Sequence, residues 1–213
     1  MKKELTESTM QKALDFAYDK AVNGITGLDS AQELAENYLQ DSGSKIEQVN
    51  SLIRWQNTKA GTSGFITGFG GLVLMPATLP ANITSVLYIQ IRMVAAIAYI
   101  GGHDIKSDKV KTFIYASLLG NAAKEALKDV GIQIGKKVAV NLIKSIPVTV
   151  ITKINHKVGF KLVTKFGEKG ILNLGKAVPV IGGVIGGTVD ILSTNTIGNV
   201  ARNIFIDMKE KNC

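Results

Sequence analysis

The chain has 213 residues, 46% of them hydrophobic and 20% charged, and a formal net charge of +8. That length suits one domain with a core of its own, and the composition excludes a disordered chain. The only cysteine, Cys213, excludes an internal disulfide framework, and the charged N-terminal residues are not followed by the apolar run of a secretory signal, so we expect a cytoplasmic protein.

Helical periodicity begins close to the N-terminus. Met10, Leu14, Ala17, Tyr18 and Ala21 fall on one stripe of a helix. An apolar stripe of this kind predicts an amphipathic first helix that covers the rest of the protein.

Two capping boxes follow. Ser30 with Glu33, and Ser44 with Glu47, have the spacing at which a serine oxygen and a glutamate side chain satisfy each other's backbone N–H groups at a helix start. They predict a short second helix and a third helix that begins near residue 44. We assign residues 1–40 to N-terminal helices that pack on a main domain of residues 41–213.

Residues 60–91 carry no charge, and Pro76 and Pro80 interrupt them. The prolines exclude one straight span and predict a helical hairpin with arms at 60–75 and 81–100. The first arm would be about 24 Å long, short of the roughly 30 Å of a bilayer core. The hairpin is either re-entrant in a membrane or buried at the centre of a soluble bundle. Gly64 and Gly68, four residues apart, suit close helix packing in both settings.

The chain beyond the hairpin also reads as helical. Gly101 and Gly102 end the second arm, and Ser107 precedes a helix that we expect to continue, with a break, into a longer amphipathic helix ending near residue 145. After Pro147 we expect shorter helices separated by glycines, among them Gly159. The fold class is therefore all-α: a multi-helix bundle around an apolar, glycine-rich hairpin.

A second charge-poor stretch, residues 177–201, contains only one charged side chain, Asp190. We expect a buried or re-entrant helix packed on the hairpin. Its glycines give two overlapping G-x-x-x-G pairs: Gly182, Gly183, Gly186 and Gly187.

Polar side chains inside these apolar helices are the candidate binding residues. Arg92 and Asp190 could form a buried ion pair, or Arg92 could hold a lipid phosphate or carboxylate; with Asp190 as general base the same pair would serve a hydrolase. The candidates are Gln90, Arg92, Asp190, Asn195 and Arg202.

Charge is distributed unevenly. Residues 1–56 have a net charge of −3, and residues 57–213 a net charge of +11. Lysines recur through one segment and suit an anionic surface such as lipid headgroups, or they form a solvated helix face. No nucleic-acid motif accompanies them, so nucleic acid is not an expected partner. The predicted basic face comprises Lys144, Lys153, Lys157, Lys161, Lys165 and Lys169.

Two blocks resemble the bacterial EcsC family. They are Leu79-Pro80-Ala81-Asn82 with residues 90–98 and Gly102-His103-Asp104, and residues 178–187 followed by Gly198, Ala201-Arg202 and Phe205. The resemblance covers roughly residues 40–207 and departs from the pattern at Thr78, where an acidic residue is expected. It implies a helical fold and a membrane-proximal role, because the family takes its name from an operon that also encodes the Ecs ABC transporter. It supplies no accepted catalytic residues.

No P-loop, dinucleotide fingerprint, nucleophile elbow or H-E-x-x-H motif is present, and His103 and His156 lack ligand-spaced neighbours. We therefore lean away from an enzyme and expect no metal and no cofactor. The expected function is a binding or accessory protein peripheral to the inner face of the cell membrane, which contacts anionic lipid, an ABC transporter or another membrane protein through the hairpin and the basic face. The alternatives are a soluble regulatory protein without membrane contact, a hydrolase of membrane substrates, and a pore-forming, toxin-like protein.

Overall fold

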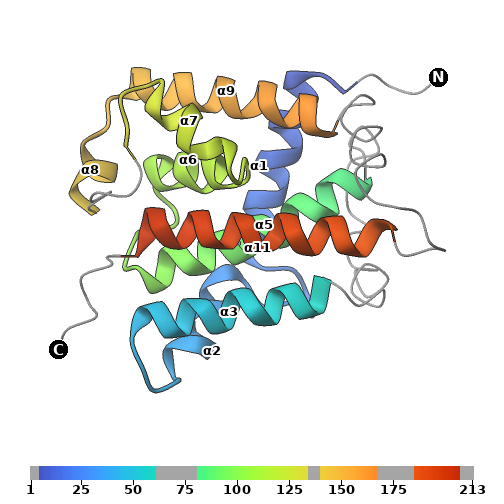
Figure 1. Ribbon diagram of the computed structural model, residues 1–213, viewed down its shortest axis with the longest axis vertical. Helices are drawn as coiled ribbons and strands as arrows, with labels where there is room; N and C mark the ends of the chain where they lie inside the picture. The colour runs from blue at the N-terminus through green and yellow to red at the C-terminus, as the bar shows by residue number, and fades with distance from the viewer. Residues whose placement is uncertain (1–4, 61–80, 134–139, 167–184, 207–213) are drawn as a thin grey trace.

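A computed structural model describes residues 5–60, 81–133, 140–166 and 185–206, with the backbone alone at 57–60, 81–82, 140–142 and 185–193. Within these ranges the fold is all-α, as predicted, and contains no β-strand. The helices, labelled as in Figure 1, are α1 (Glu7–Asn23), α2 (Ala31–Leu39), α3 (Lys45–Ala60), α5 (Ala81–Ile100), α6 (Asp108–Ser117), α7 (Ala122–Lys128), α8 (Val140–Ser145), α9 (Val148–Phe166) and α11 (Ile185–Phe205).

The first three helices form where the sequence predicts them. All five residues of the predicted apolar stripe on α1 are buried. Ser30 Oγ accepts from the Glu33 N–H at 3.2 Å while the Glu33 carboxylate accepts from the Ser30 N–H at 2.7 Å. Ser44 and Glu47 make the same reciprocal pair at 3.4 and 2.8 Å. These local capping signals therefore mark the starts of α2 and α3.

Helix α5, the second arm of the predicted hairpin, is the centre of the fold. It lies behind α11 in Figure 1 and packs against α1, α2, α3, α6 and α11. Residues 87–98 are all buried. Among the described residues, α5 is the one helix long and apolar enough to cross a membrane, but 83% of its apolar stretch Ile83–Ile100 is buried within the protein. A core helix of a soluble bundle has the same composition. The first arm, with Gly64 and Gly68, lies outside the described residues.

The segment after residue 107 differs from the prediction. Helix α6 ends at Ser117, α7 ends at Lys128 and α8 ends at Ser145. The break after α6 and the helix end near residue 145 agree with the prediction, but the single longer helix expected between them is wrong. Gly120 (φ +58°) and Gly131 (φ +84°) take the left-handed conformation, which interrupts a right-handed helix. The prediction of shorter helices after Pro147 is also wrong, because α9 runs through Gly159 without a break. Burial of Ile154, Val158 and Leu162 on one face outweighs the roughly 1 kcal/mol that a glycine costs a helix.

Helix α11 packs against α3 and α5, and glycines permit the close approach. A Cβ on Gly198 would lie 2.8 Å from the Ile53 side chain of α3, and one on Gly101 would lie 2.3 Å from the Phe205 carbonyl oxygen. Of the glycines predicted to serve this purpose, Gly186 and Gly187 lie in the first turn of α11, and Gly182 and Gly183 lie outside the described residues.

Candidate functional site

Arg92 is 5% exposed in the middle of α5. Its Nη1 donates to the carbonyl of Asp29 at 3.1 Å, and its guanidinium lies 5.6 Å from the centre of the Tyr88 ring. Its Nε has no hydrogen-bond partner, and no carboxylate of the described residues pairs with it. Arg92 therefore joins α5 to the loop between α1 and α2. The side chain of Asp190 lies outside the described part of the chain, so the Arg92–Asp190 pair stays a prediction.

The other predicted binding residues whose side chains the structure describes lie on α5 and α11. Gln90 is buried on α5, Asn195 is exposed and accepts from Asn199 at 3.4 Å, and Arg202 donates to the Asn50 side chain on α3. The Asn195 bond lies within α11 and the Arg202 bond joins α11 to α3, so neither bond leads to Arg92. The described residues also contain no group of three or more His, Cys, Asp or Glu that could hold a metal ion.

His103 has a role that the sequence left open. It is 6% exposed, its Nε2 lies 3.0 Å from the Phe205 carbonyl, and its ring packs edge-on against the Phe205 ring at 5.2 Å. A carbonyl can only accept, so Nε2 carries the proton and donates. His103 thus closes the C-terminal end of α11, where helix carbonyls lack partners.

Burial lowers the pKa of His103 below its ordinary value of 6.5; the hydrogen bond to Phe205 opposes this shift, and Lys144 and Lys45 add to it. The pKa of His103 is lower in the folded state than in the unfolded state. Its contribution to stability is therefore fully present above about pH 6.5 and is lost as the pH falls through the folded-state pKa. His103→Gln keeps an N–H donor but does not titrate, so we expect the free energy of unfolding of this variant to decrease less as the pH falls. Urea unfolding of both proteins from about pH 7.5 to pH 5 measures it. Equal pH dependence in the two proteins would contradict the assignment.

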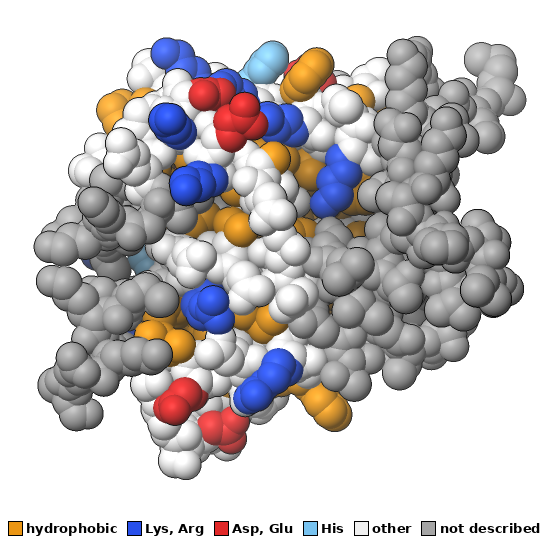
Figure 2. Space-filling view, viewed as in Figure 1, with side chains coloured by type: hydrophobic (Ala, Val, Ile, Leu, Met, Phe, Trp, Pro, Cys, Tyr) orange, Lys and Arg blue, Asp and Glu red, His pale blue; other side chains and the backbone are white. Residues whose placement is uncertain are grey.

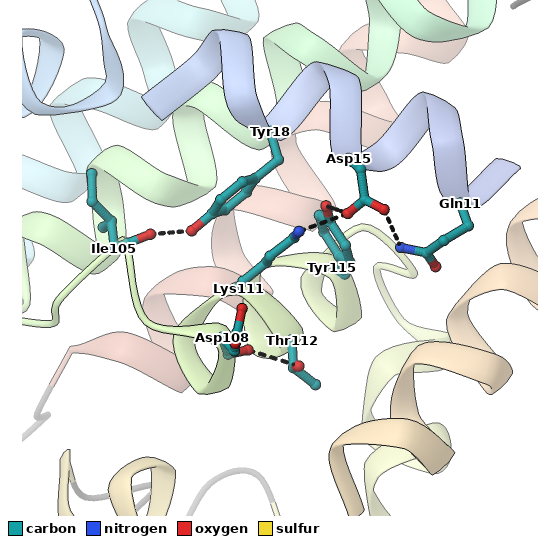
Figure 3. Close-up of polar contacts among 8 residues, drawn as sticks. All are labelled: Gln11, Asp15, Tyr18, Ile105, Asp108, Lys111, Thr112 and Tyr115. Carbon is teal, nitrogen blue, oxygen red and sulfur yellow. Dashed lines mark hydrogen bonds and ion pairs between the residues drawn. The ribbon is translucent and has the colours of Figure 1, made fainter. Parts of the chain in front are cut away.

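Sequence reasoning missed a polar cluster between α1 and α6 (Figure 3). Lys111 Nζ lies 2.6 Å from the Asp15 carboxylate, which also accepts from the Tyr115 hydroxyl at 2.9 Å and from Gln11 at 3.2 Å. The ammonium of Lys111 lies over the rings of Tyr18 and Tyr115. These residues come from segments about a hundred positions apart, so spacing gave no signal.

The electrostatics of this cluster indicate a structural role. Burial raises the pKa of Tyr115, and the Asp15 charge raises it further, so the hydroxyl stays protonated and donates. Burial alone would raise the pKa of Asp15, but hydrogen bonds from Lys111, Gln11 and Tyr115 lower it overall. A neutral tyrosine and an ionised carboxylate that accepts three hydrogen bonds hold α1 against α6 and offer no activated nucleophile.

The outer faces of α7 and α9 form one charged surface, visible as blue and red side chains over these helices in Figure 2. Below it is called the α7–α9 surface. Its charged members are Lys124, Glu125, Lys128, Asp129, Lys153, Lys157, Lys161 and Lys165. Four residues of the predicted basic face are among them; Lys144 is exposed on α8, and Lys169 lies outside the described residues.

Two of these lysines have counter-charges that the local sequence did not reveal. Lys157 lies 2.5 Å from Asp129, and Lys161 lies 3.4 Å from Glu125. The hydrogen bond from Lys157 lowers the pKa of Asp129. Glu125 lies on α7 and Asp129 caps its C-terminal end, so the tertiary structure supplies the acidic partners that α9 itself lacks.

Large apolar side chains are also exposed on α9. Phe160 is 58% exposed among the lysines, and Val148 at the start of the helix is 73% exposed. His156, also exposed, lies 3.5 Å from Glu7 of α1. Phe160 is thus a large apolar side chain exposed beside lysines, on a helix whose apolar face is buried in the bundle.

A known protein family matches nearly the whole chain. The model of the EcsC protein family matches residues 2–206. The chain belongs to the EcsC family. This EcsC match includes α1 and α2, so family similarity begins well before residue 40; the division between residues 40 and 41 stays a prediction. Curated proteins and solved structures gave no match to this EcsC chain.

Proposed function

We propose that this EcsC-family protein is an accessory protein that docks on the anionic inner face of the cell membrane through the α7–α9 surface. The observation that carries the proposal is Phe160, more than half exposed in a helix face where Lys153, Lys157 and Lys161 surround it. Lysines attract anionic headgroups, and the aromatic ring can enter the boundary between headgroups and acyl chains.

The charges of this surface support reversible docking. The α7–α9 surface contains six lysines and two carboxylates. Each basic residue near an anionic membrane contributes about 1 kcal/mol, so a net charge of about +4 supports a measurable but salt-sensitive attraction. The buried helix α5 takes no part in this proposal. An ABC transporter or another membrane protein as partner stays a prediction.

A second candidate is a soluble protein that uses the same surface to bind an acidic protein partner. The burial of α5 favours it, because the apolar helix that suggested membrane insertion is accounted for as core. The two candidates differ in what the surface meets, and vesicle binding separates them.

Detergent-free protein is sedimented with vesicles of phosphatidylcholine alone and of phosphatidylcholine with phosphatidylglycerol, across a salt series. We expect binding to the anionic vesicles only, weakening as salt rises. Lys153→Gln with Lys165→Gln removes two charges and should weaken binding by about 2 kcal/mol, roughly 30-fold. Phe160→Ser should reduce the fraction of vesicle-bound protein that stays bound at high salt.

The matched control is Lys45→Gln with Lys106→Gln, on α3 and in the loop before α6, which changes the net charge equally but lies off the α7–α9 surface. Its affinity should stay within about threefold of the unmodified protein. Failure of a monodisperse protein to bind anionic vesicles would refute the membrane proposal and favour an acidic protein partner.

A further inference from the structure

The two ion pairs between α7 and α9 lie on the surface proposed to meet the membrane. Glu125 on α7 and Asp129, the residue that caps α7, are four residues apart, and so are Lys157 and Lys161 on α9. Asp129 pairs with Lys157 and Glu125 with Lys161, so the two helices match in opposite directions. Residues four apart share a helix face, so both pairs follow from one alignment of α7 with α9.

The side chains of these ion pairs are exposed enough for the lysines to exchange their carboxylate partners for other anions. The side chains of Lys157 and Lys161 are 35% and 34% exposed, and those of Asp129 and Glu125 are 48% and 71% exposed. Ion pairs at such positions contribute little to stability, since water and salt screen them. An anionic surface that presents many phosphates can therefore compete for the same two ammonium groups.

We infer that Glu125 and Asp129 act as built-in counter-ions that lower the affinity of the α7–α9 surface for lipid phosphates, and that docking releases Lys157 and Lys161 from them. The inference rests on the proposed function. In this inference, the carboxylates at α7 set how tightly the lysines of α9 bind lipid phosphates. Lys124 and Lys128, which are exposed and precede Glu125 and Asp129 directly in the sequence, keep this helix from repelling the membrane when the pairs open.

The test compares Glu125→Gln with Asp129→Asn, as a double variant, against the unmodified protein on phosphatidylglycerol-containing vesicles at constant salt. Two fewer opposing charges at the surface should tighten binding about tenfold. The control double variant, Glu36→Gln with Asp41→Asn, removes the same charge near α2 and should change binding by less than about twofold.

A double-mutant cycle separates release from a simple change in net charge. Lys157→Gln should weaken binding only about twofold in the unmodified protein, where Asp129 offsets the lysine, and about fivefold in the Asp129→Asn background. Additive effects, or equal tightening by both double variants, would overturn the inference and leave membrane docking intact. Absence of binding by every variant would overturn the proposed function and the inference together.

Discussion

Replacing Tyr115 with alanine is expected to destabilise the protein by about 3–5 kcal/mol, the range for removing a large aromatic side chain from a core. Tyr115 is 1% exposed, packs edge-on against Tyr18 at 5.8 Å, and donates to Asp15. The alanine variant would leave a cavity between α1 and α6 and remove one of three donors to the carboxylate. Urea unfolding at neutral pH measures the difference in the free energy of unfolding.

Tyr115→Phe is the matched control, because it keeps the ring and removes only the hydroxyl. We expect a loss of about 1 kcal/mol, smaller than for a fully buried charged acceptor since Asp15 is half exposed. Burial raises the pKa of Asp15, but its hydrogen bonds lower it overall, so their contribution is present at neutral pH and is lost as the pH falls through that lowered pKa. An alanine variant as stable as the phenylalanine variant would show that the ring does not fill this part of the core.

Replacing Gly101 with alanine is expected to destabilise the protein by about 2–4 kcal/mol. The new Cβ would lie 2.3 Å from the carbonyl oxygen of Phe205, a distance at which backbone must move. The end of α11 would shift away from α5 and lose the hydrogen bond from His103. The free energy of unfolding and the intensity of near-ultraviolet circular dichroism should both fall.

Gly159→Ala is the comparison for Gly101→Ala. It makes the same chemical change inside α9, where an added Cβ would have no atom within 4 Å. Alanine favours a helix over glycine, so we expect a gain of about 0.5–1 kcal/mol. If both substitutions had the same effect, the close contact between Gly101 and Phe205 would not exist in solution.

Local signals predicted much of the fold because their physics is local. The apolar stripe of α1 reflects the helical period, and each capping box needs only residues three apart. The bounds of α5 follow from Pro80 before it and Gly101 after it. The predicted helix lengths failed between residues 107 and 166, where the conformations of Gly120 and Gly131 and the burial of one face of α9 decided them.

The candidate site was predicted less completely. The sequence identified the lysines of α9 by their recurrence, but neither the exposure of Phe160 nor the counter-charges of α7. Pairs such as Lys157 with Asp129 join residues 28 positions apart in neighbouring helices. Their distance depends on how the helices pack, and no spacing rule covers it.

The sequence by itself determined that this protein is helical and where its capped helices begin. It also determined that the net positive charge lies beyond residue 56 and that the chain resembles the EcsC family. Only the tertiary structure decided the setting of the apolar helix and the partners of the polar side chains. Helix α5 reads equally as a membrane segment or a core helix, because both environments select apolar residues. In the folded protein the helices packed around α5 bury 83% of its apolar stretch. Arg92 likewise required a partner, and the backbone carbonyl of Asp29, 63 residues away, became one only when the chain folded.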